Sequence, residues 1–423
     1  MERRNFIKSA AALSTVTILK PGTVFGSKAN SAIRFGFIGC GNRGTADITS
    51  LSKSGNVNVI ALADLFADQL EAAKVRVDKL NAEKGFAGVK KQNIYRGSKA
   101  YLELLNNKDI DAVLISAPCY THPSFLEAAV AAGKHAYCEK PAAIDVAGCR
   151  QIEQLGERVN GKVSLDIGFQ VPHATPYAEM ITRVRRGDIG KVVNAQLYYL
   201  ASELPIKPYK GMSYDEARIR NQFHFRELSG GTLLDQGVHM LDICNQVLQA
   251  HPLSAKGAGG LDEGLEFGNA WNHYQAIYRY PDNINVSYHS TQLGKQFSDV
   301  CARFIGTKGV AEAHYSGGVF ITGENEWDSG VARNAAEVTA EQRAAGIFLS
   351  SLYDANANKH KRFIESIETG NYLNEAKRGA TSTLTAILGR NAAESGDELT
   401  WDGLHFSNEE IDTGLDLTQF DKA

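Results

Sequence analysis

The sequence predicts an α/β protein: a doubly wound parallel sheet, followed by an α+β domain with a large, mainly antiparallel open sheet. Two observations predict this fold class. Between residues 33 and 138, apolar strand segments alternate with helical segments, which is typical of parallel sheets. Beyond about Arg158 strand segments predominate, and Pro281-Asp282-Asn283 separates two of them as a hairpin turn would. We therefore predict domains at 31–158 and 159–423, preceded by a separate segment at 1–30.

Length and composition exclude several classes of protein. The 423 residues include 45 Lys+Arg and 48 Asp+Glu, so there is no basic excess for nucleic-acid binding. No internal apolar run reaches the ~18 residues that a membrane span requires. The six cysteines form no CxxC pair, which predicts mostly free, buried thiols. We therefore expect a globular protein that does not bind nucleic acid and does not span a membrane.

Residues 1–30 have the layout of a secretory signal peptide. A basic start with Arg3-Arg4 precedes a short apolar run from Ser9 to Leu19, which ends at Lys20-Pro21-Gly22. The arginine pair resembles a twin-arginine signal, which exports folded proteins. A basic amphipathic arm is the alternative. We expect an exported, periplasmic protein.

The first predicted strand, 33–38, runs into Gly39-Cys40-Gly41-Asn42-Arg43-Gly44. A helical stretch and a second strand, ending at Asp64, follow. Strand, GxGxxG, helix, strand and acid within about thirty residues are the fingerprint of a Rossmann dinucleotide-binding domain. Gly39 is expected to make the tight turn, Gly41 to admit the diphosphate, and Gly44 to let helix and sheet pack closely.

The same segment predicts the cofactor. Asp64 lies at the position where a carboxylate accepts hydrogen bonds from the ribose hydroxyls, and its negative charge would repel a 2′-phosphate. NAD is therefore expected, and NADP less so. Asn42 and Arg43 lie in the loop and are further cofactor candidates. Arg43 contacts a phosphate or is a solvated surface side chain, and the sequence leaves both open.

Further candidates stand at the carboxyl ends of two later strands, predicted at 112–116 and 135–138. Ligands of open parallel sheets bind outside these ends. Pro118, His122, Glu139 and Lys140 occupy them and are predicted cofactor ligands.

Glu139-Lys140-Pro141, directly after a strand, resembles the signature of the Gfo/Idh/MocA oxidoreductase family. The segment 230–239, which contains Asp235 and His239, resembles the active-site helix of its second domain. A predicted helix near 380–393 resembles its late helix. The resemblance covers about 31–400 and implies a catalytic Lys140–Asp235–His239 site. It also implies a homo-dimer or homo-tetramer that pairs through the open sheet.

The residues themselves suit that chemistry. Asp235 and His239 are four apart on a predicted helix and so share one face. A histidine near its usual pKa takes a proton from a hydroxyl, while Lys140 stabilises charge on the oxygen. An ordinary helix-surface pair is the alternative. A metal site with Asp242 nearby lacks a dense His/Cys cluster, so no metal is expected.

Three polar residues are the candidate substrate ligands. Gln170 and His173 follow the strand that ends at Phe169, and His224 precedes the glycine pair 230–231.

The leading hypothesis is an NAD-dependent oxidoreductase that transfers hydride between nicotinamide and a carbon of a sugar or polyol, its small-molecule carbohydrate substrate. Export would separate the enzyme from soluble NAD(H), so a tightly bound, internally recycled cofactor is expected. One alternative is a redox-neutral, NAD-dependent glycoside hydrolase that resembles α-N-acetylgalactosaminidases. Another is a non-catalytic, nucleotide-bound sensor, against which Lys140, Asp235 and His239 together argue.

Overall fold

The computed structural model describes residues 31–421 apart from 160, 263–266, 296, 335, 337, 340–341 and 343–348. The expected signal peptide at 1–30 lies outside the described residues. Among the helices that are described, none is long and apolar enough to cross a membrane.

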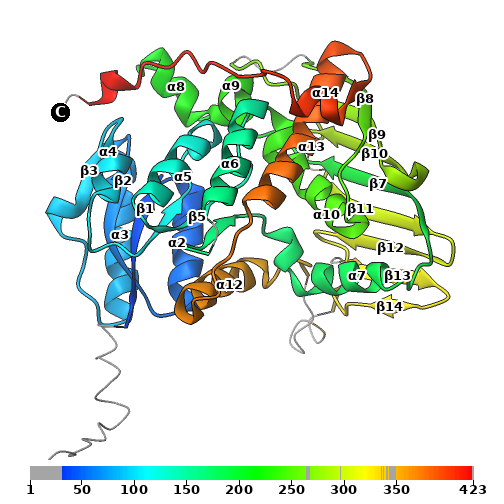
Figure 1. Ribbon diagram of the computed structural model, residues 1–423, viewed down its shortest axis with the longest axis horizontal. Helices are drawn as coiled ribbons and strands as arrows, with labels where there is room; N and C mark the ends of the chain where they lie inside the picture. Colours follow the sequence, from blue (N-terminus) through cyan, green and yellow to red (C-terminus); the bar gives the residue numbers. More distant parts are fainter. Residues whose placement is uncertain are drawn as a thin grey trace, which may run out of the picture.

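The first domain contains a six-stranded, all-parallel sheet in the order β3-β2-β1-β4-β5-β6 (Figure 1). Strand order therefore reverses between β1 and β4, which is the switch point where open α/β sheets bind ligands. Helices α2 and α3 pack on one face of the sheet and α4, α5 and α6 on the other. The strands are β1 (Ile33–Ile38), β2 (Val57–Asp64), β3 (Ile94–Arg96), β4 (Ala112–Ile115), β5 (His135–Cys138) and β6 (Leu165–Ile167). The helices are α2 (Asn42–Ser54), α3 (Ala67–Glu83), α4 (Ala100–Leu105), α5 (His122–Ala131) and α6 (Val146–Val159).

Strand β6 corrects the assignment of one predicted strand. The sequence placed the strand after Arg158 in the second domain, but β6 pairs in parallel with β5, with Ala136 opposite Leu165. The change of pattern at Arg158 marks the end of helix α6 and not the end of the sheet. The parallel sheet therefore extends to Ile167.

The second domain contains a nine-stranded sheet in the order β14-β13-β12-β11-β7-β10-β9-β8-β15. All of its pairs are antiparallel except β10 with β7. This confirms the mainly antiparallel sheet and the hairpin around Pro281–Asn283, which joins β9 to β10. The strands are β7 (Val192–Leu200), β8 (Ser254–Gly260), β9 (His273–Arg279), β10 (Asn285–Thr291), β11 (Asp299–Gly306), β12 (Gly309–His314), β13 (Val319–Gly323), β14 (Trp327–Asp328) and β15 (Leu399–Thr400).

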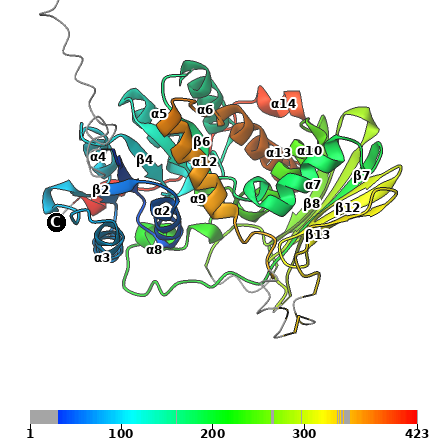
Figure 2. The same cartoon turned by 90° about the horizontal axis from the view of Figure 1, so that it is seen from below.

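Helices cover only one face of this sheet. Helices α7 (Thr175–Arg185), α10 (Val238–Leu248) and α13 (Ala376–Ser395) lie together on that face, as Figure 2 shows. Alternate strand residues such as Tyr278 and Tyr288 are buried beneath them, while Ile277 on the other side of β9 is 57% exposed. The described part of the chain therefore leaves the second face open.

Late segments of the chain return to the first domain. Helix α12 (Ala355–Thr369) packs along α2, and Phe363 joins the core around Phe35. After α14 (Trp401–His405), the chain runs back past α8 (Tyr214–Arg220) and α9 (Arg226–Ser229) and ends beside the first sheet, in red in Figure 1. The carboxylate of Asp421 there accepts hydrogen bonds from the backbone N–H and hydroxyl of Ser98 at 2.6 and 2.8 Å. The first domain is thus completed by residues from the end of the chain.

Candidate functional site

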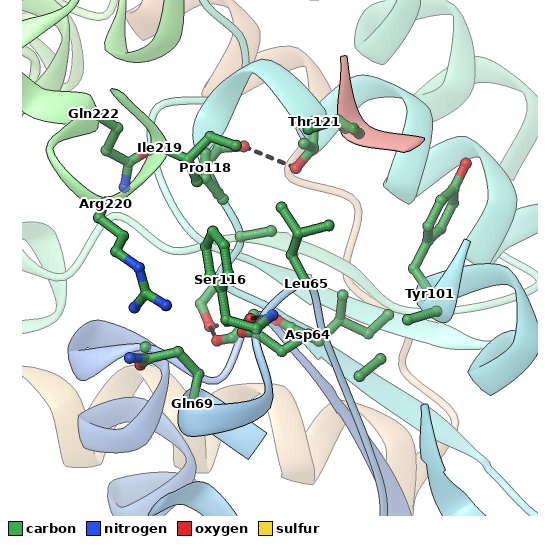
Figure 3. Close-up of a pocket in the computed structure, with 18 of the residues that line it drawn as sticks. Asp64, Leu65, Gln69, Tyr101, Ser116, Pro118, Thr121, Ile219, Arg220 and Gln222 are labelled. Atoms are coloured by element: carbon green, nitrogen blue, oxygen red, sulfur yellow. Dashed lines mark hydrogen bonds between the residues drawn. The ribbon is translucent and has the colours of Figure 1, made fainter. Parts of the chain in front are cut away.

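A pocket opens at the switch point between β1 and β4, and Asp64, Ser116 and Pro118 are among its lining residues (Figure 3). Gly39 and Gly41 of the glycine loop also line it. At Gly39 the backbone φ is +83°, and a Cβ would lie 2.3 Å from the backbone nitrogen of Ala117. At Gly44 a Cβ would lie 2.1 Å from the Ser116 hydroxyl. At Gly41, a Cβ would meet nothing within 4 Å. Gly39 and Gly44 therefore allow close packing, and Gly41 leaves free space at the start of α2.

Asp64 is fixed in the wall of this pocket. One carboxylate oxygen accepts from the Cys40 backbone N–H at 2.6 Å and the other from that of Phe66 at 2.8 Å. Burial raises the pKa of Asp64, although these two hydrogen bonds act in the opposite direction. The carboxylate is thereby held between the glycine loop and the end of β2. Asn42, Pro118 and Tyr120 line the same pocket.

A ring of four charged groups lies directly behind the glycine loop. Arg43 Nε lies 3.0 Å from Asp47 Oδ2, and Arg43 Nη2 lies 3.1 Å from Glu139 Oε1. Lys359 Nζ closes the ring, at 3.2 Å from Asp47 Oδ1 and 3.1 Å from Glu139 Oε1. Burial would raise the pKa of Glu139, but Lys359 and Arg43 outweigh it and hold that pKa well below its usual value. We call these four residues the charge ring.

The charge ring resolves the two alternatives for Arg43. Its guanidinium is neither a free phosphate ligand nor merely solvated, because two carboxylates already bind it. It also donates to Gln170 Oε1 at 3.3 Å and lines both the first pocket and its neighbour. Arg43 therefore connects the glycine loop to the site described next.

The neighbouring pocket contains all three predicted catalytic residues, Lys140, Asp235 and His239. Lys140 Nζ donates to the backbone carbonyl of Asp235 and lies 3.6 Å from Asp235 Oδ1. Asp235 lies in a wide π-helical turn, Leu233–Gly237, that leads into α10, where the sequence predicted a regular helix. Single π-turns of this kind recur at functional sites.

His239 is a neutral, buried imidazole. Its exposed fraction is only 6%, and burial, aided by the charge of Lys140, lowers its pKa well below the usual value. Its Nδ1 has no hydrogen-bond partner among the described residues. Nδ1 is itself enclosed by protein, so any contact of this ring with a ligand is made by another part of the imidazole that lines the pocket. The lowered pKa differs from the ordinary value that the sequence suggested, and its cause is burial.

His122 has both ring nitrogens occupied. Nδ1 lies 2.7 Å from the carbonyl oxygen of Pro141, and Nε2 lies 2.9 Å from that of Ala117. The ring therefore joins the segments that follow β4 and β5. Although His122 lines the second pocket, it positions Lys140–Pro141 and has no ring nitrogen free for the predicted cofactor contact.

Two of the three predicted substrate ligands line neither pocket. Gln170 lines the second pocket, but His173 and His224 do not line either. Each lies in a short helical turn that directs it elsewhere: His173 lies against α12, where its carbonyl accepts from Asn358 at 2.9 Å. His224 is buried, and its carbonyl accepts from the backbone of Asn269 at 2.8 Å.

Sequence reasoning also missed residues that form the two pockets. Tyr199, at the end of β7, lines the second pocket, and burial and the charge of Asp235 raise its pKa. Gln222 and Phe223, beside His224, line both pockets. Lys359 lies on the apolar face of α12, four residues from both Ala355 and Phe363. A lysine at this helical spacing is the one feature of the sequence that could have indicated a buried, paired charge.

Comparison with known families agrees with this geometry. Residues 33–167 match the model of the oxidoreductase family with an NAD-binding Rossmann fold, and residues 177–312 match the GFO/IDH/MocA C-terminal domain. The chain belongs to the Gfo/Idh/MocA family. This confirms the predicted NAD-binding fold and places the chain among oxidoreductases.

Members of the Gfo/Idh/MocA family with related sequences include inositol dehydrogenases. Inositol 2-dehydrogenase of Salmonella typhimurium is 30% identical over 175 residues, which are 41% of this chain and 48% of that protein. The chain thus spans about half the length of the first such relatives. Myo-inositol 2-dehydrogenase of Thermotoga maritima is 24% identical over 369 residues, 86% of this chain and 97% of the relative.

Solved structures of the family share the fold. Aldose–aldose oxidoreductase from Caulobacter crescentus, complexed with glycerol, superposes with a TM-score of 0.65 at 19% identity and covers 87% of this chain and 99% of its own. Levoglucosan dehydrogenase, in complex with NADH and levoglucosan, gives 0.68 at 15% identity over 87% and 99%.

We expect Gly39→Ala to lower mainly the stability of the protein and Gly41→Ala to lower mainly its affinity for NAD. Gly39→Ala destabilises the protein by at least about 1–3 kcal/mol, because it combines a left-handed φ with a backbone clash. Gly41→Ala changes the free energy of unfolding by less than about 0.5 kcal/mol but weakens NAD binding, because its methyl group enters the pocket. Urea unfolding and calorimetric titration with NAD measure the two effects. Equal losses of stability would contradict these assignments.

We expect Lys359→Met to lower the free energy of unfolding by about 3–5 kcal/mol, because two buried carboxylates keep one cation between them. Its loss raises the pKa of Glu139 from its lowered value and the pKa of Asp47 from its already raised value, so the deficit grows as pH rises. Urea unfolding at pH 5 and pH 8 tests this. The control is Lys361→Met on the same helix, whose 65% exposed side chain pairs with Glu365 and should cost below about 1 kcal/mol. Equal costs for the two variants would show that the charge ring is dispensable.

Proposed function

We propose that the protein is an NAD-dependent oxidoreductase that transfers hydride between nicotinamide and a carbinol carbon of a sugar or polyol. One observation carries the proposal: the pocket that holds Lys140, Asp235 and His239 adjoins the glycine-loop pocket. Arg43, Ser116, Ala117, Gln222 and Phe223 line both. A bound nicotinamide supplies the hydride acceptor or donor, and the neighbouring pocket supplies the acid–base groups.

The three polar side chains have distinct roles in this reaction. In the oxidation direction His239, which lines the pocket and is kept neutral by burial, accepts the hydroxyl proton. Lys140 donates a hydrogen bond to the same oxygen and stabilises the negative charge that develops there. Asp235 fixes the Lys140 ammonium and accepts from a neighbouring hydroxyl. A charge pair in the pocket suits an uncharged polyol.

The surroundings of Asp64 favour NAD over NADP. Arg220 lines the same pocket, but both its terminal nitrogens lie 2.9 Å from the Asp68 carboxylate, and its Nε lies 2.8 Å from Glu216. Its charge is therefore already compensated by two acids. A fixed Asp64 carboxylate beside a compensated arginine suits ribose hydroxyls better than a 2′-phosphate.

The C-terminal segment supports a retained cofactor. Leu417 lines the glycine-loop pocket, and the Phe420 ring packs edge-on against Phe66, another lining residue, with centroids 5.3 Å apart. The Arg220 guanidinium lies over the same Phe66 ring, 4.1 Å from its centroid. Segments from outside the first domain thus cover this pocket, and they would slow cofactor release.

Retention fits the export that residues 1–30 suggest. We propose that the chain is exported to the periplasm in the folded state with NAD(H) bound, and that the cofactor is recycled within the site. The open face of the nine-stranded sheet, with Ile277 exposed, is the surface through which we propose a homo-dimer or homo-tetramer.

We expect Lys140→Ala to lower turnover by at least about 100-fold while NAD still binds. Purified protein is offered free inositols, aldoses and aryl glycosides, and NADH absorbance and released aglycone are both followed. Net NADH supports the dehydrogenase, whereas aglycone release without net NADH supports the redox-neutral hydrolase. The control is Lys162→Ala on the surface. Unchanged turnover in Lys140→Ala, or loss of NAD binding, would overturn the site assignment.

We expect the double variant Leu417→Ala/Phe420→Ala to release NADH about 10-fold to 100-fold faster, since each 1.4 kcal/mol of lost contact is tenfold. NADH fluorescence on rapid dilution and the NAD(H) content of the purified protein measure the change. Phe406→Ala is the matched control, because Phe406 lies in the same segment and is 73% exposed. Equal release rates in both variants would show that the segment does not retain the cofactor.

A further inference from the structure

Three potential metal ligands meet on the open face of the nine-stranded sheet, and none of them lines either pocket. Cys301 lies on β11, and Glu312 and His314 lie on the adjacent strand β12. Cys301 and His314 are directly opposite each other in the ladder, so their side chains point to the same face. The Cys301 sulfur, a Glu312 oxygen and a His314 nitrogen lie within 4.8 Å of one another.

Their separations match those of ligands around one small cation. His314 Nε2 lies 3.5 Å from Cys301 Sγ and 3.3 Å from Glu312 Oε2. Tetrahedral zinc, with Zn–S of about 2.3 Å and Zn–N and Zn–O of about 2.1 Å, separates sulfur from nitrogen by about 3.6 Å and nitrogen from oxygen by about 3.4 Å. Two of the three separations therefore equal those of ligands around one zinc ion, and the third, between the Cys301 sulfur and a Glu312 oxygen, is at most 4.8 Å.

A fourth residue orients the imidazole. His314 Nδ1 lies 3.5 Å from Asp299 Oδ1, on the side of the ring opposite Cys301 and Glu312. A carboxylate beside Nδ1 favours the tautomer with the proton there and leaves the Nε2 lone pair free. Histidine ligands of zinc almost always have such a second partner.

We propose that Cys301, Glu312 and His314 form a Zn²⁺ site on the open face of the sheet, with Asp299 as the positioning residue for His314. A thiolate, an imidazole and a carboxylate favour zinc over magnesium or calcium, which prefer oxygen ligands. Water or one further donor completes the tetrahedron. The site crosslinks β11 to β12 and is independent of the proposed oxidoreductase function.

Two features limit its affinity. Arg303 Nη2 donates to Glu312 Oε2 at 2.7 Å, so its positive charge opposes a cation at the same oxygen that lies 3.3 Å from His314 Nε2, and zinc must compete with this ion pair. Burial raises the pKa of the Cys301 thiol to about 12. Zinc binding therefore replaces the thiol proton, which leaves to solvent, and affinity rises with pH.

The test uses chelator-treated, full-length protein titrated with Zn²⁺ by calorimetry and with Co²⁺ by absorption spectroscopy. We expect one ion per chain and, with cobalt, a thiolate charge-transfer band and tetrahedral d–d bands. Cys301→Ser removes the charge-transfer band and weakens zinc binding by more than about 100-fold, and Asp299→Asn weakens it by about 10-fold to 100-fold. Glu312→Gln, which keeps the shape of the side chain, also weakens binding.

The control is His289→Gln, because His289 lies on the same open face and stacks on Tyr198. It should bind zinc like the wild type. Thermal unfolding without zinc checks that each variant folds, and added zinc should raise Tm in the wild type but not in Cys301→Ser. Absence of the thiolate band, or zinc affinity unchanged in Cys301→Ser, would overturn the proposal. Neither result would alter NAD binding or turnover, so the two proposals fail separately.

Discussion

The charge ring of Arg43, Asp47, Glu139 and Lys359 is the constraint on which the arrangement of the two pockets depends. It joins the start of α2, the end of β5 and helix α12, and Lys359 follows Glu139 by 220 residues. Glu139 directly precedes Lys140, so the ring fixes the backbone from which the Lys140 side chain reaches Asp235. Buried charges are stable only when each is compensated, because the desolvation of an unpaired ion costs several kcal/mol. The ring is therefore complete only when α12 packs against the first domain. The position of the proposed catalytic Lys140 thus depends on Lys359, which comes from a distant part of the chain.

A second ion network supports His239 from behind. Asp242, three residues further along α10, lies 3.0 Å from Arg378 Nη1 and accepts from the Ser382 hydroxyl at 2.7 Å, so α10 is tied to α13. The Arg378 guanidinium lies 5.4 Å from the centre of the Phe169 ring, and that ring meets the His239 imidazole edge-on at 6.3 Å. His239 is thus held by an edge-on aromatic contact, and its Nδ1 makes no hydrogen bond to a carboxylate among the described residues. Burial lowers the pKa of His239, so the ring is held in the neutral form, which is the form that can accept a proton.

Local patterns predicted most of the fold and the centre of the site. Each motif of the site is contiguous or nearly so in the sequence: the glycine loop, Glu139-Lys140, and Asp235 with His239. The strand ends of a parallel sheet also meet at one edge, which brings the first two motifs together. Strand alternation does not state which sheet a strand joins, and for that reason β6 was assigned to the wrong sheet. His224 directly follows the pocket residue Phe223, and His173 lies three residues after Gln170, but both lie in 3₁₀ turns, where the direction of a side chain changes by about 120° per residue. Lys359, Tyr199 and the C-terminal segment come from distant parts of the chain, and no local pattern connects them to the pockets.

The charges around the glycine-loop pocket also indicate how a dinucleotide is held. The two arginines among its described lining residues are compensated, Arg43 by Asp47 and Glu139 and Arg220 by Asp68 and Glu216. Neither arginine is a free cation for the diphosphate, so the backbone N–H groups at the start of α2 and Lys207, a third basic lining residue, remain to contact it. Apolar contact adds to the affinity, and the aromatic Phe66, covered by Phe420 and Arg220, together with Leu417 provides it. Salt has little effect on apolar contact. The attraction between exposed charges, in contrast, is largely screened beyond the Debye length, which is about 8 Å at physiological ionic strength. A cofactor held by apolar contact and backbone N–H groups, with a single lysine nearby, is consistent with the near-balanced composition of the chain, with a net charge of −3.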